Sequence, residues 1–152
     1  MRCRDAMTRA VVGCSVEEPM DACARKMRDH GVGFLPVFEG DDAVGVVTDR
    51  DLVVRGLAVK RPITAPVGEV MTAEPLTCDA DEDAAAAQRR MAQGGVSRLL
   101  VLDGDRVVGV LALADIARAS DPTTVGVTLR ALRNAQQECH VPVVDKCIAG
   151  RR

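Results

Sequence analysis

The chain has 152 residues, of which 47% are hydrophobic and 28% charged, and its formal net charge is −2. This is the balance of a globular domain, but the slight negative charge and the lack of Trp and Tyr argue against nucleic-acid partners, which need basic surfaces and stacking platforms. No apolar run reaches the roughly 18 residues of a membrane span and the first residues lead into no signal-peptide core, so we expect a soluble, cytoplasmic protein without nucleic-acid or membrane partners.

The first unit along the chain begins with a short apolar segment, Val11–Val12, and an acidic stretch that precedes a helix. Pro19 suits the first turn of this helix, where its missing N–H leaves no hydrogen bond unmade. Gly31 is the residue type that ends helices. Between them, apolar residues recur at the three-and-four spacing of one helix face: Met20, Cys23, Ala24 and Met27.

Two strands and another helix are predicted next. Residues 35–38 form a near-continuous apolar run, which is typical of a buried strand. The acidic glycine turn at 39–42 predicts a hairpin connection to a return strand at 43–47. A second helix is expected to begin near Thr48.

The same order of elements returns 64 residues later. Met7-Thr8 aligns with Met71-Thr72 and Asp51 with Asp115, and the register holds without a gap from residue 6 to about residue 120. An ungapped match of this length indicates a tandem repeat. A unit of about 60 residues buries its helices poorly alone, so we expect two β-α-β-β-α motifs of the α+β class that pack together.

The repeat divides the chain into four predicted segments. The first motif covers residues 1–60, a proline-containing linker covers 61–66 and the second motif covers 67–120. Residues 121–152 form a C-terminal extension, with an amphipathic helix expected up to about Glu138 and a Pro-interrupted apolar arm after it.

Several segments of both copies resemble the cystathionine-β-synthase (CBS) domain pair, or Bateman module, of the stand-alone bacterial type. They are the paired Met-Thr openings, residues 31–37, and residues 45–52, which match the family's glycine–hydrophobic–x–threonine–x–x–aspartate signature. The resemblance covers about residues 5–120. It implies a pseudo-twofold pair with two clefts that binds an adenosine-containing ligand (AMP, ADP, ATP, S-adenosylmethionine, NAD or a cyclic dinucleotide) and regulates an attached or partner protein.

The residues of the signature have chemistry that suits a nucleotide. Gly45 lets another group approach its strand closely. Thr48 lies at a strand-to-helix junction, where its hydroxyl and the helix dipole favour a phosphate. Asp51, one turn later, can accept hydrogen bonds from a ribose diol, and the guanidinium of Arg50 matches phosphate geometry.

A purely structural interpretation of Thr48 and Asp51 also holds. Thr-x-x-Asp at a helix start is an approximate capping box, in which each side chain bonds the other residue's backbone. The two interpretations are compatible, because a cap in the free protein can become a ligand contact. The CBS resemblance favours the binding role.

The second copy departs from the signature. It keeps Asp115 as a candidate ribose ligand but has Ala112 where the first copy has a threonine, so the two clefts are expected to differ. The resemblance makes Arg98 a candidate phosphate contact for the cleft of the first copy, and a surface arginine is the alternative. Phe34, at the matching position of the first copy, is expected either as an apolar wall for a base or as a core residue.

No catalytic set of residues is apparent, because the two histidines are isolated from any nucleophile motif. We therefore expect no enzyme and no required cofactor, but a nucleotide-binding homodimer that acts on a client protein. One alternative is an interaction module with empty clefts. Another is a metal or redox sensor built on Cys139, His140 and Cys147, although the spacing of these residues is not that of a zinc site, and reduced, mostly buried thiols are favoured.

Overall fold

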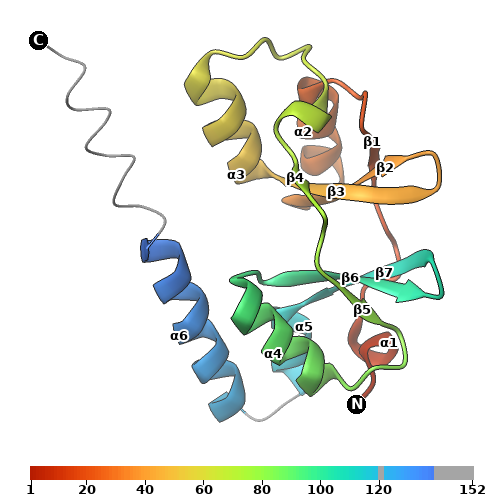
Figure 1. Cartoon of the computed structure of the whole chain (residues 1–152), viewed down its shortest axis with the longest axis vertical. Coiled ribbons are helices and arrows are strands. Elements are labelled where there is room, and N and C mark those ends of the chain that lie inside the picture. The colour runs from red at the N-terminus through yellow and green to blue at the C-terminus, as the bar shows by residue number, and fades with distance from the viewer. Residues whose placement is uncertain (120–121, 139–152) are drawn as a thin grey trace, which may run out of the picture.

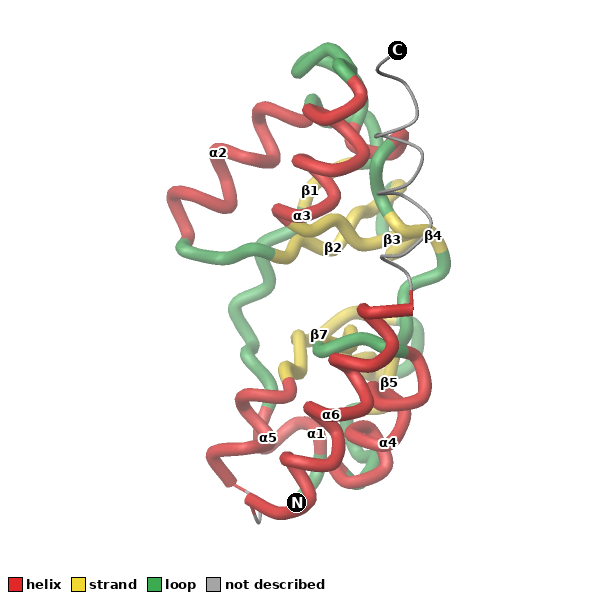
Figure 2. Tube along the Cα trace, turned by 90° about the vertical axis from the view of Figure 1, so that its left-hand side faces the viewer, coloured by secondary structure: helices red, strands yellow, loops and turns green. Residues whose placement is uncertain are grey.

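The computed structural model describes residues 1–119 and 122–138. Figures 1 and 2 show two motifs stacked along the long axis, with their sheets facing the middle and most helices outside. The chain has the predicted α+β class and tandem architecture, and each motif is built around a mixed sheet. No described helix has the length and apolar character needed to cross a bilayer.

The first motif follows the predicted order, with its first strand slightly later than the apolar segment at Val11–Val12. Its elements are β1 (Cys14–Ser15), α2 (Met20–His30), β2 (Phe34–Glu39), β3 (Asp42–Thr48) and α3 (Asp49–Asp51), which continues through a π-helical turn (Leu52–Gly56) and a 3-10 turn (Leu57–Val59). Helix α2 ends as expected at Gly31, whose φ of 65° is in the left-handed region.

The second motif repeats this order and adds one helix. Its elements are β5 (Thr77–Asp79), α4 (Ala84–Gly94), β6 (Arg98–Asp103), β7 (Arg106–Ala112) and α5 (Leu113–Ala119). Helix α6 (Pro122–Glu138) agrees with the predicted amphipathic helix and lies along the second motif (Figure 1). It packs on α4 and α5, where Gln88 donates a 3.0 Å hydrogen bond to Thr128 Oγ1 and Leu132 is buried. The predicted apolar arm after Glu138 falls outside the described residues.

The two motifs exchange the segments that precede them. Helix α1 (Cys3–Ala6) leads to Thr8, which pairs with Val110 in the second motif. Correspondingly, a 3-10 turn (Val67–Glu69) leads to β4 (Thr72–Ala73), which pairs with β3 of the first motif. Each Met-Thr opening found in the sequence therefore lies against the sheet of the other motif.

Two equivalent glycines make room for the exchanged segments. A Cβ atom on Gly45 would lie 2.6 Å from Met71 Sδ and 2.7 Å from the Thr72 carbonyl oxygen. On Gly109 it would lie 2.5 Å from Met7 Sδ. The close approach expected at Gly45 is thus made by the chain itself, in the segment leading into β4.

The exchange also contributes residues to the hydrophobic core of each motif. Val67 and Val70 are fully buried in the core of the first motif, and Cys3 is fully buried in that of the second. A fully buried aliphatic side chain contributes about 1.5–3 kcal/mol, so these residues tie each motif to the segment before the other. The largest fully buried side chains are Leu, Met, Ile, Val and Pro rather than aromatic ones, in a chain that has two Phe and neither Trp nor Tyr.

Candidate functional site

A cleft of about 400 Å³, here called the Thr48 cleft, lies between the motifs. Pockets that hold small molecules start at about this size. The first motif contributes Phe34, Thr48 and Asp51 to its lining, and the second contributes Ser97 and Arg98. The segment around β4 closes one side with Thr72, Glu74, Pro75 and Leu76. Four of the predicted site residues, Phe34, Thr48, Asp51 and Arg98, are therefore brought together.

Thr48 and Asp51 form a reciprocal cap at the start of α3. The Thr48 amide donates to Asp51 Oδ2 at 2.9 Å, and the Asp51 amide donates to Thr48 Oγ1 at 3.1 Å. These bonds satisfy two helix-terminal groups that would otherwise lack partners. The capping interpretation is thus present in the structure, and it also fixes the Thr48 hydroxyl and the Asp51 carboxylate at the cleft wall.

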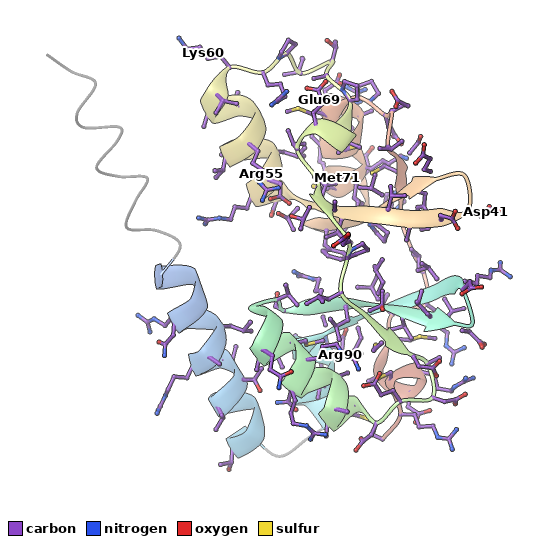
Figure 3. The ribbon with its side chains drawn as sticks, viewed as in Figure 1. Asp41, Arg55, Lys60, Glu69, Met71 and Arg90 are labelled. Atoms are coloured by element: carbon purple, nitrogen blue, oxygen red, sulfur yellow. The ribbon has the colours of Figure 1, made fainter. Side chains whose placement is uncertain are left out.

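Arg55 connects this cap to the exchanged segment. Its Nε lies 3.8 Å from Asp51 Oδ1, and its Nη1 donates to the Met71 carbonyl at 3.1 Å. Figure 3 shows Arg55 and Met71 on these neighbouring elements. Only 16% of the Asp51 side chain is exposed, and Arg55, which does not line the cleft, supplies this carboxylate with a nearby cation.

A second, smaller hollow of about 200 Å³ occupies the equivalent place and is called the Ala112 cleft. Asp115 lines it, and its Oδ2 accepts a 3.3 Å hydrogen bond from the Ala112 amide while its Oδ1 pairs with Arg118 at 3.0 Å. Half of the capping box is therefore retained, without the hydroxyl that Thr48 supplies in the first motif. The clefts are unequal, as the sequence predicts.

Phe34 and Arg98 contribute to both clefts. They open β2 and β6 at equivalent positions, where Phe34 pairs across the sheet with Thr48 and Arg98 pairs with Ala112. The Arg98 guanidinium lies over the Phe34 ring, a cation–π arrangement. Arg98 is exposed, and it makes no ion pair with any described residue, so its charge is available to an anion.

Two other predicted site residues lie elsewhere among the described residues. Gly45 is buried beneath the Met71-Thr72 segment and does not line either cleft. Arg50 is exposed next to Asp49, whose Oδ1 accepts its amide hydrogen bond at 2.8 Å, and it also lines neither cleft.

Sequence reasoning missed Glu74 and Arg55. Glu74 follows the repeated Met-Thr pair, and its counterpart 64 residues earlier is Ala10, which lines the Ala112 cleft. The 64-residue register makes the two positions equivalent, but only the exchange of segments places them at the clefts. Nothing local in the sequence indicates Arg55, because its partners come from the exchanged segment.

Other hollows offer weaker candidates. One hollow, of about 1190 Å³, is an open depression between the two hairpin turns, and Asp41, Asp42, Asp103 and Asp105 are among its lining residues. Within residues 1–119 and 122–138, no group of three or more His, Cys, Asp or Glu side chains could hold a metal ion. Cys139, His140 and Cys147 fall outside the described residues.

The exchanged tandem motifs form a pseudo-twofold pair with two clefts between them, and sequence comparison assigns its family. The CBS-domain model matches residues 3–57 and 67–122. The chain therefore belongs to the CBS-domain family, as the resemblance implied.

Individual relatives agree with this assignment. The uncharacterized protein YlbB of Bacillus subtilis is 34% identical over 116 residues, which cover 75% of this chain and 78% of that protein. Hypoxic response protein 1 of Mycobacterium tuberculosis is 37% identical over 117 residues, covering 76% and 82%. The match spans about four fifths of each relative and about three quarters of this chain.

Two solved structures are similar to the chain. The structure of Hypoxic Response Protein I with two coordinated zinc ions has a TM-score of 0.72 at 35% identity, covering 80% of this chain and all of that one. CBSX2 in complex with AMP has a TM-score of 0.67 at 26% identity, covering 78% and 94%. An adenosine nucleotide is therefore bound by one structural relative and zinc by another.

Proposed function

We propose that this chain is a regulatory sensor that binds an adenosine-containing ligand in the Thr48 cleft and thereby modulates a client protein. The observation that carries the proposal is the convergence of a hydroxyl, a carboxylate and a free guanidinium on one cleft of ligand size, from Thr48, Asp51 and Arg98. In this proposal Asp51 accepts the ribose hydroxyls and Phe34 offers an apolar face to the base.

The AMP complex of CBSX2 supports the ligand class. A ligand that touches both motifs has contacts that depend on their relative placement. It shifts the module toward the arrangement that it binds better, which is the physical requirement for regulation. Such binding needs no catalytic group, and we propose that the chain is not an enzyme.

Calorimetric titration with AMP, ADP, ATP, S-adenosylmethionine and NAD tests the proposal, with Asp51→Asn as the binding variant. We expect at least one ligand with a Kd well below about 1 mM and a loss of affinity of about tenfold or more in Asp51→Asn, because a charged hydrogen-bond acceptor contributes about 1.5–3 kcal/mol. If none of the five ligands binds, the sensor function is wrong for this class.

We also propose that the sensor works as a homodimer. In the second motif, α6 covers the helix pair α4 and α5, whereas in the described residues no third helix covers the equivalent pair of the first motif. Here four aliphatic side chains in the π-helical and 3-10 turns that follow α3 are exposed: Val53, Val54, Leu57 and Val59. A second copy of the chain would bury this patch, named the α3 patch.

The described cysteines bear on the location of the sensor. Cys3, Cys14, Cys23 and Cys78 are all buried free thiols, as is usual in a reducing compartment, and this supports a cytoplasmic location. The alternative metal or redox sensor based on Cys139, His140 and Cys147 predicts stoichiometric metal, or a thiol-dependent change in ligand affinity, in protein purified without chelator.

A further inference from the structure

The start of α3 has no free amide for a phosphate chain. The Asp49 amide donates to the Gly33 carbonyl at 3.1 Å, the Arg50 amide to Asp49 Oδ1 at 2.8 Å, and the Asp51 amide to Thr48 Oγ1 at 3.1 Å. A helix N-terminus binds anions through unpaired amides and its positive dipole. Here the amides are paired, and Asp49 and Asp51 already supply negative charge to this end of the helix.

The charged side chains that line the Thr48 cleft are Asp51, Glu74 and Arg98. Asp51 is already engaged by its cap and by Arg55. The carboxylate of Glu74, by contrast, has no hydrogen bond or ion pair within the described part of the chain, and the Arg98 guanidinium lies over the Phe34 ring without an ion pair to a described residue. A ligand therefore meets one available cation and one available anion, and the Asp51–Arg55 pair adds no net charge.

The backbone at Glu74 adds a second observation. Its φ of 54° is in the left-handed region, where a non-glycine residue is uncommon and such conformations concentrate at ligand sites. Its amide donates to the Val44 carbonyl at 3.3 Å, which ties this turn to β3. The glutamate is thus held at the cleft by a backbone conformation that glycine would adopt more easily.

From these observations we propose that Glu74 is a specificity-determining residue that makes the Thr48 cleft select adenosine derivatives with no more than one phosphate group. One phosphate, or a carboxylate, can pair with Arg98. Further phosphates in a cleft of about 400 Å³ stay within a Debye length of Glu74, about 8–10 Å, and are repelled by it. The proposal rests on the adenosine-binding function proposed above. It adds a prediction of how much negative phosphate charge the bound ligand can carry.

Titration calorimetry with adenosine, AMP and magnesium-free ATP at constant ionic strength tests this selection. The chains compared are the wild type, Glu74→Gln and, as the matched control, Glu39→Gln at the far end of β2. We expect the wild type to bind ATP about three- to fivefold more weakly than AMP, the factor typical of exposed charges. Glu74→Gln is expected to abolish this difference without changing adenosine affinity, and Glu39→Gln is expected to retain it. A Glu74→Gly chain should show the same loss of selection without a lower melting temperature.

Two results overturn the selection by Glu74. One is wild-type affinity for ATP equal to or higher than that for AMP, and the other is an equal effect of Glu74→Gln on all three ligands. In both cases binding itself is still observed, so the sensor function survives. Absence of binding by adenosine, AMP and ATP refutes the selection by Glu74, and the sensor function is refuted with it if ADP, S-adenosylmethionine and NAD also fail to bind.

Discussion

The guanidinium carbon of Arg98 lies 5.8 Å from the centre of the Phe34 ring, and the two residues occupy equivalent positions 64 residues apart. The pair therefore lies where the motifs meet, and both residues line both clefts. A side chain that is drawn toward a ligand in one cleft is withdrawn from the other. The two candidate sites thus share residues and are expected to compete for them.

We predict one bound adenosine ligand per chain at saturation. The Ala112 cleft is half the size of the Thr48 cleft and lacks the threonine hydroxyl, and a ligand that engages Arg98 from the Thr48 cleft removes that cation from its neighbour. Calorimetry gives the stoichiometry directly. Two sites of equal affinity in one chain would contradict the assignment of a single principal cleft.

Ala112→Thr is predicted to raise the stability of the second motif. The Ala112 amide already donates to Asp115 Oδ2, so a threonine hydroxyl would complete the capping box seen at Thr48. A cap of this kind contributes about 0.5–1 kcal/mol, which corresponds to a rise of about 1–4 °C in Tm for a chain of this size. Thermal unfolding followed by circular dichroism measures this change in Tm. An unchanged or lower Tm would show that the start of α5 cannot accept a threonine hydroxyl.

The buried thiols of Cys3 and Cys78 are predicted to make the protein less stable at high pH. Burial raises the pKa of Cys78 to about 12 and also raises the pKa of Cys3. A raised folded-state pKa gives stability that is fully present below the ordinary thiol pKa and lost as the pH rises toward the folded value. We therefore expect a constant Tm at neutral pH and a decline above about pH 9.

Alkylation provides the control for this prediction. In the folded protein at pH 8, iodoacetamide should leave the peptides that contain Cys3, Cys14, Cys23 and Cys78 unmodified, and in urea it should modify all four. Rapid modification of these four residues in the folded protein would contradict their burial.

Leu57→Glu is predicted to convert a dimer into a monomer. Leu57 is 66% exposed in the single chain and lies in the α3 patch, so a charge there would be buried without a partner in the dimer. Sedimentation velocity measures the assembly, and Lys60→Glu, an exposed charge change nearby, serves as the control. A monomeric wild type, or a Leu57→Glu chain that remains dimeric, would show that a second copy does not cover this patch.

The repeat made most of the fold predictable. The 64-residue register fixed the order of elements, and the helix ends at Gly31 and Gly95 have the same φ of 65°. The exchange of segments was not predictable, because nothing local in Met7-Thr8 or Met71-Thr72 indicates which sheet they join. The numbered boundaries of the motifs remain a prediction for the same reason, since each packing unit draws residues from both halves of the chain.

The candidate site was predictable where it lies at positions of the family signature or at matching positions of the two motifs. Phe34, Thr48, Asp51 and Arg98 were expected and lie at one cleft, although their ligand contacts remain predictions. Glu74 was missed because its importance depends on the exchanged segment, which brings a residue outside the signature to the cleft wall.

The most direct test of the account compares AMP binding by Thr48→Ala and Asp83→Ala. Both substitutions remove a helix-capping hydrogen bond, from the Asp51 amide at 3.1 Å and from the Ala85 amide at 3.2 Å, and both should lower stability by about 1 kcal/mol. Only Thr48 lies at the cleft. We predict that AMP affinity falls about tenfold in Thr48→Ala and is unchanged in Asp83→Ala. Equal AMP affinity in the two variants would contradict a ligand-binding role for the Thr48 cleft and leave Thr48 as a cap alone.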